Sequence, residues 1–146
     1  MYQRILVPVD GCPASNRGLI EAVKLAQSTK ATLKLVHVVD EFVFDPASTP
    51  VVLYEPLLQS LKVNGRKVLD EAEESVKQVG LEVESELIET IGGSVAEPVL
   101  KAAERWRADL IVMGTHGRRG IRRAVLGSDA EMVLRGADVP VLLLRA

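Results

Sequence analysis

The feature that most constrains this chain is a regular alternation of short apolar runs with longer segments of helical periodicity. Five apolar runs are typical of buried strands and lie at 5–9, 32–39, 81–89, 110–113 and 139–144. Four intervening segments repeat apolar residues at the helical period, at 13–29, 55–78, 94–107 and 128–136. Such alternation favours parallel strands joined by right-handed crossovers. We therefore expect a single doubly wound α/β domain over residues 1–146. It should be an open sheet of five parallel strands in the order 3-2-1-4-5, with helices on both faces.

Composition narrows the class of protein. Hydrophobic residues make up 47% of the chain and aromatic residues only 3%, which favours a core of Val, Leu, Ile and Ala. The net charge of −2 lacks the basic excess of a nucleic-acid-binding protein, and no apolar run is long enough for a membrane span. The single cysteine, Cys12, and an N-terminal apolar run too short for a signal peptide favour a cytoplasmic location.

One connection is unusual. Residues 40–56 contain three prolines and are apolar for a loop, with the sequence DEFVFDPASTPVVLYEP. Two interpretations stay open: an ordered loop packed against the domain, or a lid or partner surface.

The segment most informative about function is 113–128, with the sequence MGTHGRRGIRRAVLGS. It joins a buried strand to a helix N-terminus, and its glycines permit positive φ angles and close approach to a ligand. The helix N-terminus attracts anions, and four arginines concentrate positive charge here: Arg118, Arg119, Arg122 and Arg123. These features suit phosphate, although the spacing is neither a P-loop nor a dinucleotide fingerprint. Equally, the glycines can serve turns, Ser128 can act only as an N-cap, and the arginines can be a solvated surface.

Strand order places a second candidate beside this segment. In an open sheet, ligands bind beyond the carboxyl ends of the strands where the strand order reverses, here between the first and fourth strands. Asp10 ends the first strand and Gly114 follows the fourth, so both are expected to line one crevice. The Asp10 carboxylate can accept hydrogen bonds from a ribose hydroxyl or an adenine amine, or it can be a turn residue before Gly11.

Three long segments carry a family resemblance: ILVPVDGCPASNRGLIEAVKLA, LVHVVD and DLIVMGTHGRRGIRRAVLGSDAEMVLRGADVPVLLL. Through them the whole chain resembles the universal stress protein family. The pattern G-x-x-G, nine residues, then G-[S/T] marks the ATP-binding branch of that family, and Gly114, Gly117, Gly127 and Ser128 fit it. The resemblance implies an ATP-binding stress-response regulator, a nucleotide-dependent sensor or interaction module that uses ATP together with Mg²⁺.

The resemblance also implies which residues meet the nucleotide. They are Pro8, Val9, Asp10, Val38, Met113, Gly114, Gly117, Arg118, Gly127 and Ser128, to which we add Thr115 and Asp129 as candidate residues. Two positions depart from the family pattern: Cys12 stands where serine is common, and Asp129 where a small or apolar residue is usual. A carboxylate in the first helical turn competes with phosphate for the same dipole. Asp129 can therefore weaken triphosphate binding, help to hold Mg²⁺, or point to solvent.

Two other functions remain alternatives. A slow ATPase or nucleotidyl-transferring enzyme of the same broad fold would need a general base, for which His116 is the candidate, but no carboxylate is clearly paired with it. We therefore predict no catalytic residue and no protein-built metal site. A pure interaction module with an empty site is the third option, and the intact glycine pattern argues against it.

A difference in charge between the two edge strands of the expected sheet predicts a homodimer. The third strand is one edge and carries acidic residues that discourage further pairing: Glu82, Glu84, Glu86 and Glu89. The fifth strand, VPVLLL, is the other edge and has no such charges. We expect it to pair antiparallel with its mate in a second copy, centred on residues 141–143 because Pro140 lacks an N–H group. The family resemblance implies the same dimer.

Overall fold

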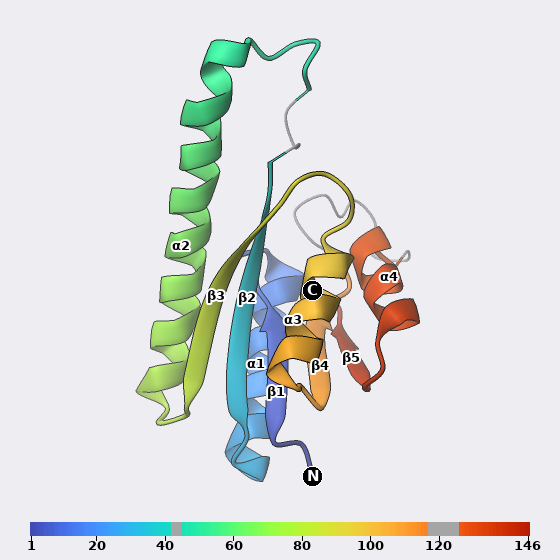
Figure 1. Cartoon of the computed structure of the whole chain (residues 1–146). Helices are drawn as coiled ribbons and strands as arrows, with labels where there is room; N and C mark the ends of the chain where they lie inside the picture. Colours follow the sequence, from blue (N-terminus) through green and yellow to red (C-terminus); the bar gives the residue numbers. More distant parts are fainter. Residues whose placement is uncertain (42–44, 117–125) are drawn as a thin grey trace.

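The sheet has the topology that the sequence predicts. A computed structural model describes residues 1–41, 45–116 and 126–146, and within them the chain forms one α/β domain (Figure 1). Five parallel strands lie in the order β3-β2-β1-β4-β5. The strands are β1 (Arg4–Pro8), β2 (Thr32–Asp40), β3 (Val83–Thr90), β4 (Leu110–Gly114) and β5 (Val141–Leu144). The helices are α1 (Pro13–Thr29), the 3₁₀ turn η1 (Val51–Leu53), α2 (Tyr54–Gln78), α3 (Ala96–Trp106) and α4 (Ser128–Gly136).

Helices cover both faces of the sheet, α1 and α2 on one and α3 and α4 on the other (Figure 1). Successive residues of a strand point to opposite faces, so each central strand feeds two cores. In β1, Ile5 and Val7 pack in the core beneath α1 and α2, whereas Leu6 packs in the core beneath α3 and α4. All three side chains are fully buried, which explains why this run is continuously apolar.

A cluster of polar contacts fixes the amino end of β1 beside β4. The Asp109 carboxylate accepts hydrogen bonds from the backbone N–H groups of Gln3, at 2.8 Å, and Arg4, at 3.0 Å. The Arg4 guanidinium donates to the carbonyl of Trp106 at 2.7 Å and lies 4.1 Å from the centre of its indole ring. These contacts join residues about a hundred positions apart and set the register of the two strands whose other ends frame the site described below.

The spacings Ser94 to Glu97 and Ser128 to Glu131 in the sequence are those of a capping box and predict each serine as an N-cap, but both helices begin differently. Helix α4 has Gly127 at its N-cap, and Ser128 is its first helical residue without a side-chain capping bond. Helix α3 begins at Ala96, whose N–H donates to the Ser94 hydroxyl at 2.9 Å, so this serine stabilises the turn before the helix. The serine and glutamate spacing was therefore a correct signal for a nearby helix start but gave the wrong N-cap residue.

The apolar connection between β2 and α2 leaves side chains in solvent. Val51 and Val52 in η1 are 77% and 80% exposed, so this part of the loop is not packed against the domain. Helix α2 extends beyond the sheet at this end, as Figure 1 shows, and its buried residues begin only at Gly65. In the part of the chain that the structure describes, no helix is long and apolar enough to cross a membrane.

Candidate functional site

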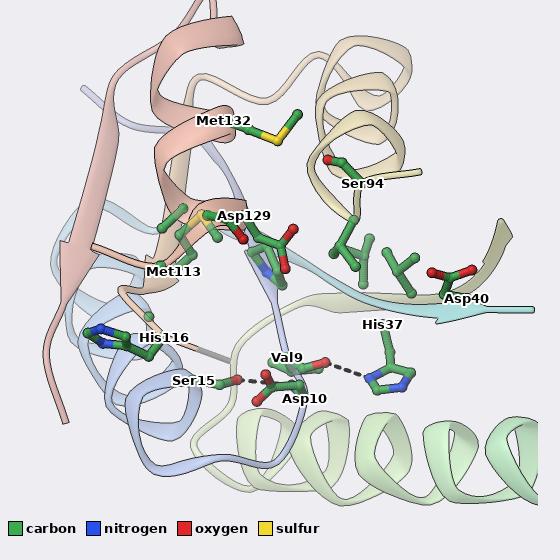
Figure 2. Close-up of a pocket in the computed structure, with 18 of the residues that line it drawn as sticks. Val9, Asp10, Ser15, His37, Asp40, Ser94, Met113, His116, Asp129 and Met132 are labelled. Carbon is green, nitrogen blue, oxygen red and sulfur yellow. Dashed lines mark hydrogen bonds between the residues drawn. The ribbon is translucent and has the colours of Figure 1, made fainter. Parts of the chain in front are cut away.

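A pocket of about 530 Å³ lies at the carboxyl ends of β1, β2 and β4 (Figure 2). It opens between β1 and β4, where the strand order reverses. This is the position at which open α/β sheets bind ligands, and the volume falls within the usual range for small-molecule sites. Its walls also include residues of α2, the loop before α3 and the first turn of α4.

The pocket brings together residues that the sequence analysis selected from distant parts of the chain. Ten of the twelve line it: Pro8, Val9, Asp10, Val38, Met113, Gly114, Thr115, Gly127, Ser128 and Asp129. The other two, Gly117 and Arg118, lie outside the described residues. The fold brings the ten described residues together in one pocket. That they bind a ligand stays a prediction.

One wall of the pocket is apolar. Val9 and Met113 stand at the ends of β1 and β4 with only 5% and 8% of their surface exposed, and Val38 contributes from β2. Met132, from the second turn of α4, also lines the pocket and is half exposed. Apolar side chains held rigidly on three strands suit a flat, uncharged group such as a base.

Asp10 combines a turn role with a place in the pocket wall. Its carboxylate accepts a hydrogen bond from the Cys12 N–H at 2.8 Å, and its own N–H donates to the Ser15 hydroxyl at 3.0 Å (Figure 2). Gly11 follows with φ of +82°, a conformation that favours glycine. The turn interpretation of Asp10 is thus confirmed, and the same turn holds its carboxylate at the mouth of β1 beside the pocket.

Gly114 and Gly127 are needed by the fold for a reason that the sequence did not reveal. Neither has a positive φ. Instead, a Cβ atom on Gly114 would lie 2.6 Å from the Ala14 carbonyl carbon, and one on Gly127 would lie 2.5 Å from the Thr115 carbonyl oxygen. The Gly127 N–H donates to that same oxygen at 2.8 Å. These glycines therefore permit close approach of protein backbone to protein backbone, which shapes the pocket before any ligand enters.

His37 belongs to the pocket and was missed by the sequence analysis. It is 8% exposed, and its Nδ1 lies 2.7 Å from the Val9 carbonyl oxygen. A carbonyl can only accept, so Nδ1 carries the proton and donates. The ring lies against α2, where a Cβ on Gly65 would come within 2.6 Å of it. The available signal was a polar residue at an inward-facing position within the buried run LVHVVD.

The far side of the pocket was also missed. It comes from the end of β2, the α2 helix and the loop before α3, through Asp40, Leu61, Asn64, Gly93, Ser94 and Val95. Asp40 holds this loop in place, because its carboxylate accepts a hydrogen bond from the Gly92 N–H at 3.2 Å. The carboxyl ends of β2 and β3 are neighbours in the sheet, and this adjacency was the only signal that could have pointed to the loop.

His116 does not form the base–carboxylate pair of a hydrolytic site in the part of the chain described. Its Nδ1 lies 3.0 Å from the Thr115 hydroxyl, and its Nε2 is buried without a hydrogen-bond partner among the described residues. Nor do the described residues contain a cluster of three or more His, Cys, Asp or Glu side chains that could hold a metal ion.

Asp129 faces the pocket. It is half-buried in the first turn of α4, and Figure 2 shows its carboxylate directed into the cavity. Among the described residues no hydrogen bond or ion pair neutralises it. Glu131, in the same turn, differs: its carboxylate pairs with Arg135 at 2.7 Å and does not line the pocket.

Comparison with known proteins decides the family. The universal stress protein family matches residues 1–145 of this chain. The chain belongs to the universal stress protein family. A universal stress protein of Methanocaldococcus jannaschii is 33% identical over 147 residues, which covers 99% of this chain and 83% of the relative. Universal stress protein A homolog 1 of Coxiella burnetii is 35% identical over 142 residues, covering 97% and 94%.

Solved structures agree with this assignment. A universal stress family protein of Burkholderia pseudomallei is 35% identical, with a TM-score of 0.80 over 99% of this chain and 97% of that one. Two further members were solved as complexes, one with cAMP and one, from Archaeoglobus fulgidus, with dAMP. At 24% and 22% identity and TM-scores of 0.67 and 0.70, covering 98% or more of this chain and 97% or more of each of theirs, they show a shared fold.

Proposed function

We propose that this universal stress protein is an adenine-nucleotide-binding regulator of the stress response. The spacing of Gly114, Gly117, Gly127 and Ser128 in the sequence, which the family resemblance links to ATP, supports ATP as the ligand, with Mg²⁺ carried in by the phosphates. The nucleotide changes a surface that partner proteins read, so the chain acts as a sensor or interaction module. We propose that residues 1–146 form a single nucleotide-binding domain.

The observation that carries this proposal is the composition of the pocket wall. An apolar side from β1, β2 and β4 faces a base, while the start of α4 offers the positive end of a helix dipole to phosphate. Asp10 lines the same pocket and offers an acceptor for ribose hydroxyl groups. The cAMP and dAMP complexes support the choice of an adenine nucleotide, since both proteins share this fold.

Calorimetric titration with ATP, AMP and GTP tests the proposal. We expect saturable binding of the adenine nucleotides and at least tenfold weaker binding of GTP. Asp10→Asn keeps an oxygen for the Cys12 N–H but replaces the second carboxylate oxygen with an N–H donor. This variant should retain the wild-type unfolding temperature and lose nucleotide affinity. Wild-type protein that binds neither ATP nor AMP would contradict the proposal.

Turnover separates a regulator from an enzyme. A sensor should release ATP unchanged or hydrolyse it more slowly than roughly one per second, the low end of ordinary enzymes. Steady hydrolysis above that rate, lost in His116→Asn, would favour the slow-ATPase alternative instead.

We also propose that the regulator is a homodimer through β5. This strand is an edge of the sheet, and its four residues, Val141–Leu144, are only half-buried within one chain. An open apolar edge is stabilised by pairing with a partner, and a second copy is the simplest one. Light scattering at micromolar concentration should give twice the chain mass, and Val141→Lys with Leu143→Lys should give monomer or insoluble protein. A wild-type monomer would contradict the dimer.

A further inference from the structure

The described part of the pocket wall carries acidic side chains and no basic ones. Three carboxylates line it, from Asp10, Asp40 and Asp129, and none of its described lining residues is Lys or Arg. The arginines of segment 117–125 lie outside the described residues. Asp10 and Asp40 each accept a backbone hydrogen bond from within the protein. The Asp129 carboxylate receives no hydrogen bond or ion pair from the described residues, so within the described part of the pocket its charge faces whatever enters the cavity.

The position of Asp129 makes phosphate the group that it acts on. It is the second residue of α4, so its carboxylate occupies the same helix N-terminus that the proposed function assigns to phosphate. A carboxylate there already interacts with the helix dipole, and it repels a second anion. The repulsion grows with every phosphoryl group added to the ligand, whereas the base and ribose contacts stay the same.

We infer that Asp129 is a specificity-determining residue whose charge weakens the binding of ligands with uncompensated phosphate charge. AMP should therefore bind at least as tightly as metal-free ATP. The inference rests on the proposed function and names the form of the nucleotide that the site prefers. Mg²⁺ lowers the charge of ATP, so MgATP is the triphosphate form that the pocket accepts. The affinity of the pocket for a nucleotide therefore depends on the number of its phosphates and on whether Mg²⁺ is bound to them.

The chain offers a matched control. Asp129→Asn removes the charge and keeps the size of the side chain. Glu131→Gln removes the same charge from the same helical turn, but Glu131 lies outside the pocket wall and is paired with Arg135. A general effect of net charge or of the helix dipole would appear in both variants. An effect of the pocket wall would appear in Asp129→Asn alone.

Calorimetric titration of adenosine, AMP and ATP in EDTA, then of ATP with Mg²⁺, tests the inference. In EDTA, wild-type protein should bind ATP no more tightly than AMP. Asp129→Asn should strengthen ATP binding by about five- to thirtyfold, the upper part of the range for a partly buried charge at a helix N-terminus. It should strengthen AMP less and leave adenosine unchanged, while Glu131→Gln keeps the wild-type ratio.

The outcomes separate the two proposals. If none of the adenine ligands binds, the proposed function fails and the inference with it. If they bind but Asp129→Asn changes all three equally or none of them, the inference alone is overturned. It is also overturned if Asp129→Asn weakens MgATP and leaves metal-free ATP unchanged, because Asp129 would then be a magnesium ligand.

Discussion

Gly114→Ala tests whether backbone packing, and not ligand approach, requires glycine at the end of β4. The added Cβ would lie 2.6 Å from the Ala14 carbonyl carbon and 2.8 Å from the carbonyl oxygen of the same residue. Ordinary contact begins near 3.4 Å, so the first turn of α1 would have to retreat by about 0.8 Å. Ala22 and Ala26 are fully buried against the sheet, so α1 cannot retreat without opening the core.

The cost follows from this geometry. Overpacking of a rigid core costs about 1–3 kcal/mol, which for a domain of this size lowers the unfolding temperature by roughly 3–10 °C. Gly136→Ala is the matched control, because its Cβ would lie 2.7 Å from the end of the flexible Leu100 side chain, with every other neighbour at 3.9 Å or beyond. That side chain can rotate away, so we expect a change within about 0.5 kcal/mol.

Thermal and urea unfolding followed by circular dichroism measure both variants without any ligand. The reasoning predicts a lower midpoint for Gly114→Ala and a nearly unchanged one for Gly136→Ala. Equal midpoints for Gly114→Ala and wild type would refute the backbone-contact explanation and return Gly114 to a role in ligand approach alone.

Three further predictions concern the fold. Leu69→Ala, at a fully buried position of α2, should lower the free energy of unfolding by about 2–5 kcal/mol in urea titration. Asp109→Ala should cost about 1–2 kcal/mol in the same assay, because two backbone N–H groups of the chain start lose their acceptor, and Asp109→Asn should cost less. Hydrogen bonds from Ser85 and then Lys77 lower the pKa of Glu73, so its stabilising contribution is present above about pH 4.5 and lost as the pH falls through the lowered folded-state pKa. Unfolding midpoints measured from pH 6 to pH 3 should therefore fall less steeply for Glu73→Gln than for wild type.

The fold could be predicted from the sequence because its signals are local. Continuous apolar runs such as Ile5 to Val7 identify strands that are buried on both faces, and the four helical segments repeat their apolar residues at the helical period. Parallel order then follows from the alternation of the two. The N-caps were harder to place, because Ser94 and Ser128 each lie one residue from the observed N-cap and the local pattern does not fix the helix start to a single residue.

The pocket could be predicted only in part, because much of it depends on contacts between distant residues. Asp10 and Gly114 were brought together by strand order alone. The clash partner of Gly114, by contrast, is Ala14, a hundred residues earlier, and no local pattern records that distance. The sequence around His37 indicates only a core residue, because its hydrogen bond with the Val9 carbonyl depends on the packing of two different strands. The charge of Asp129 was visible in the sequence, but its direction into the cavity was not.

The central claim is that the pocket at the ends of β1, β2 and β4 binds an adenine nucleotide. Methyl NMR spectra recorded during a titration with AMP test it most directly. We expect saturable shifts of the Val9, Val38 and Met113 methyl groups, while those of Leu69 and Val76, on the buried face of α2, stay unchanged. No saturable shift at these three residues, or shifts centred instead on the exposed Val51 and Val52 of η1, would contradict it.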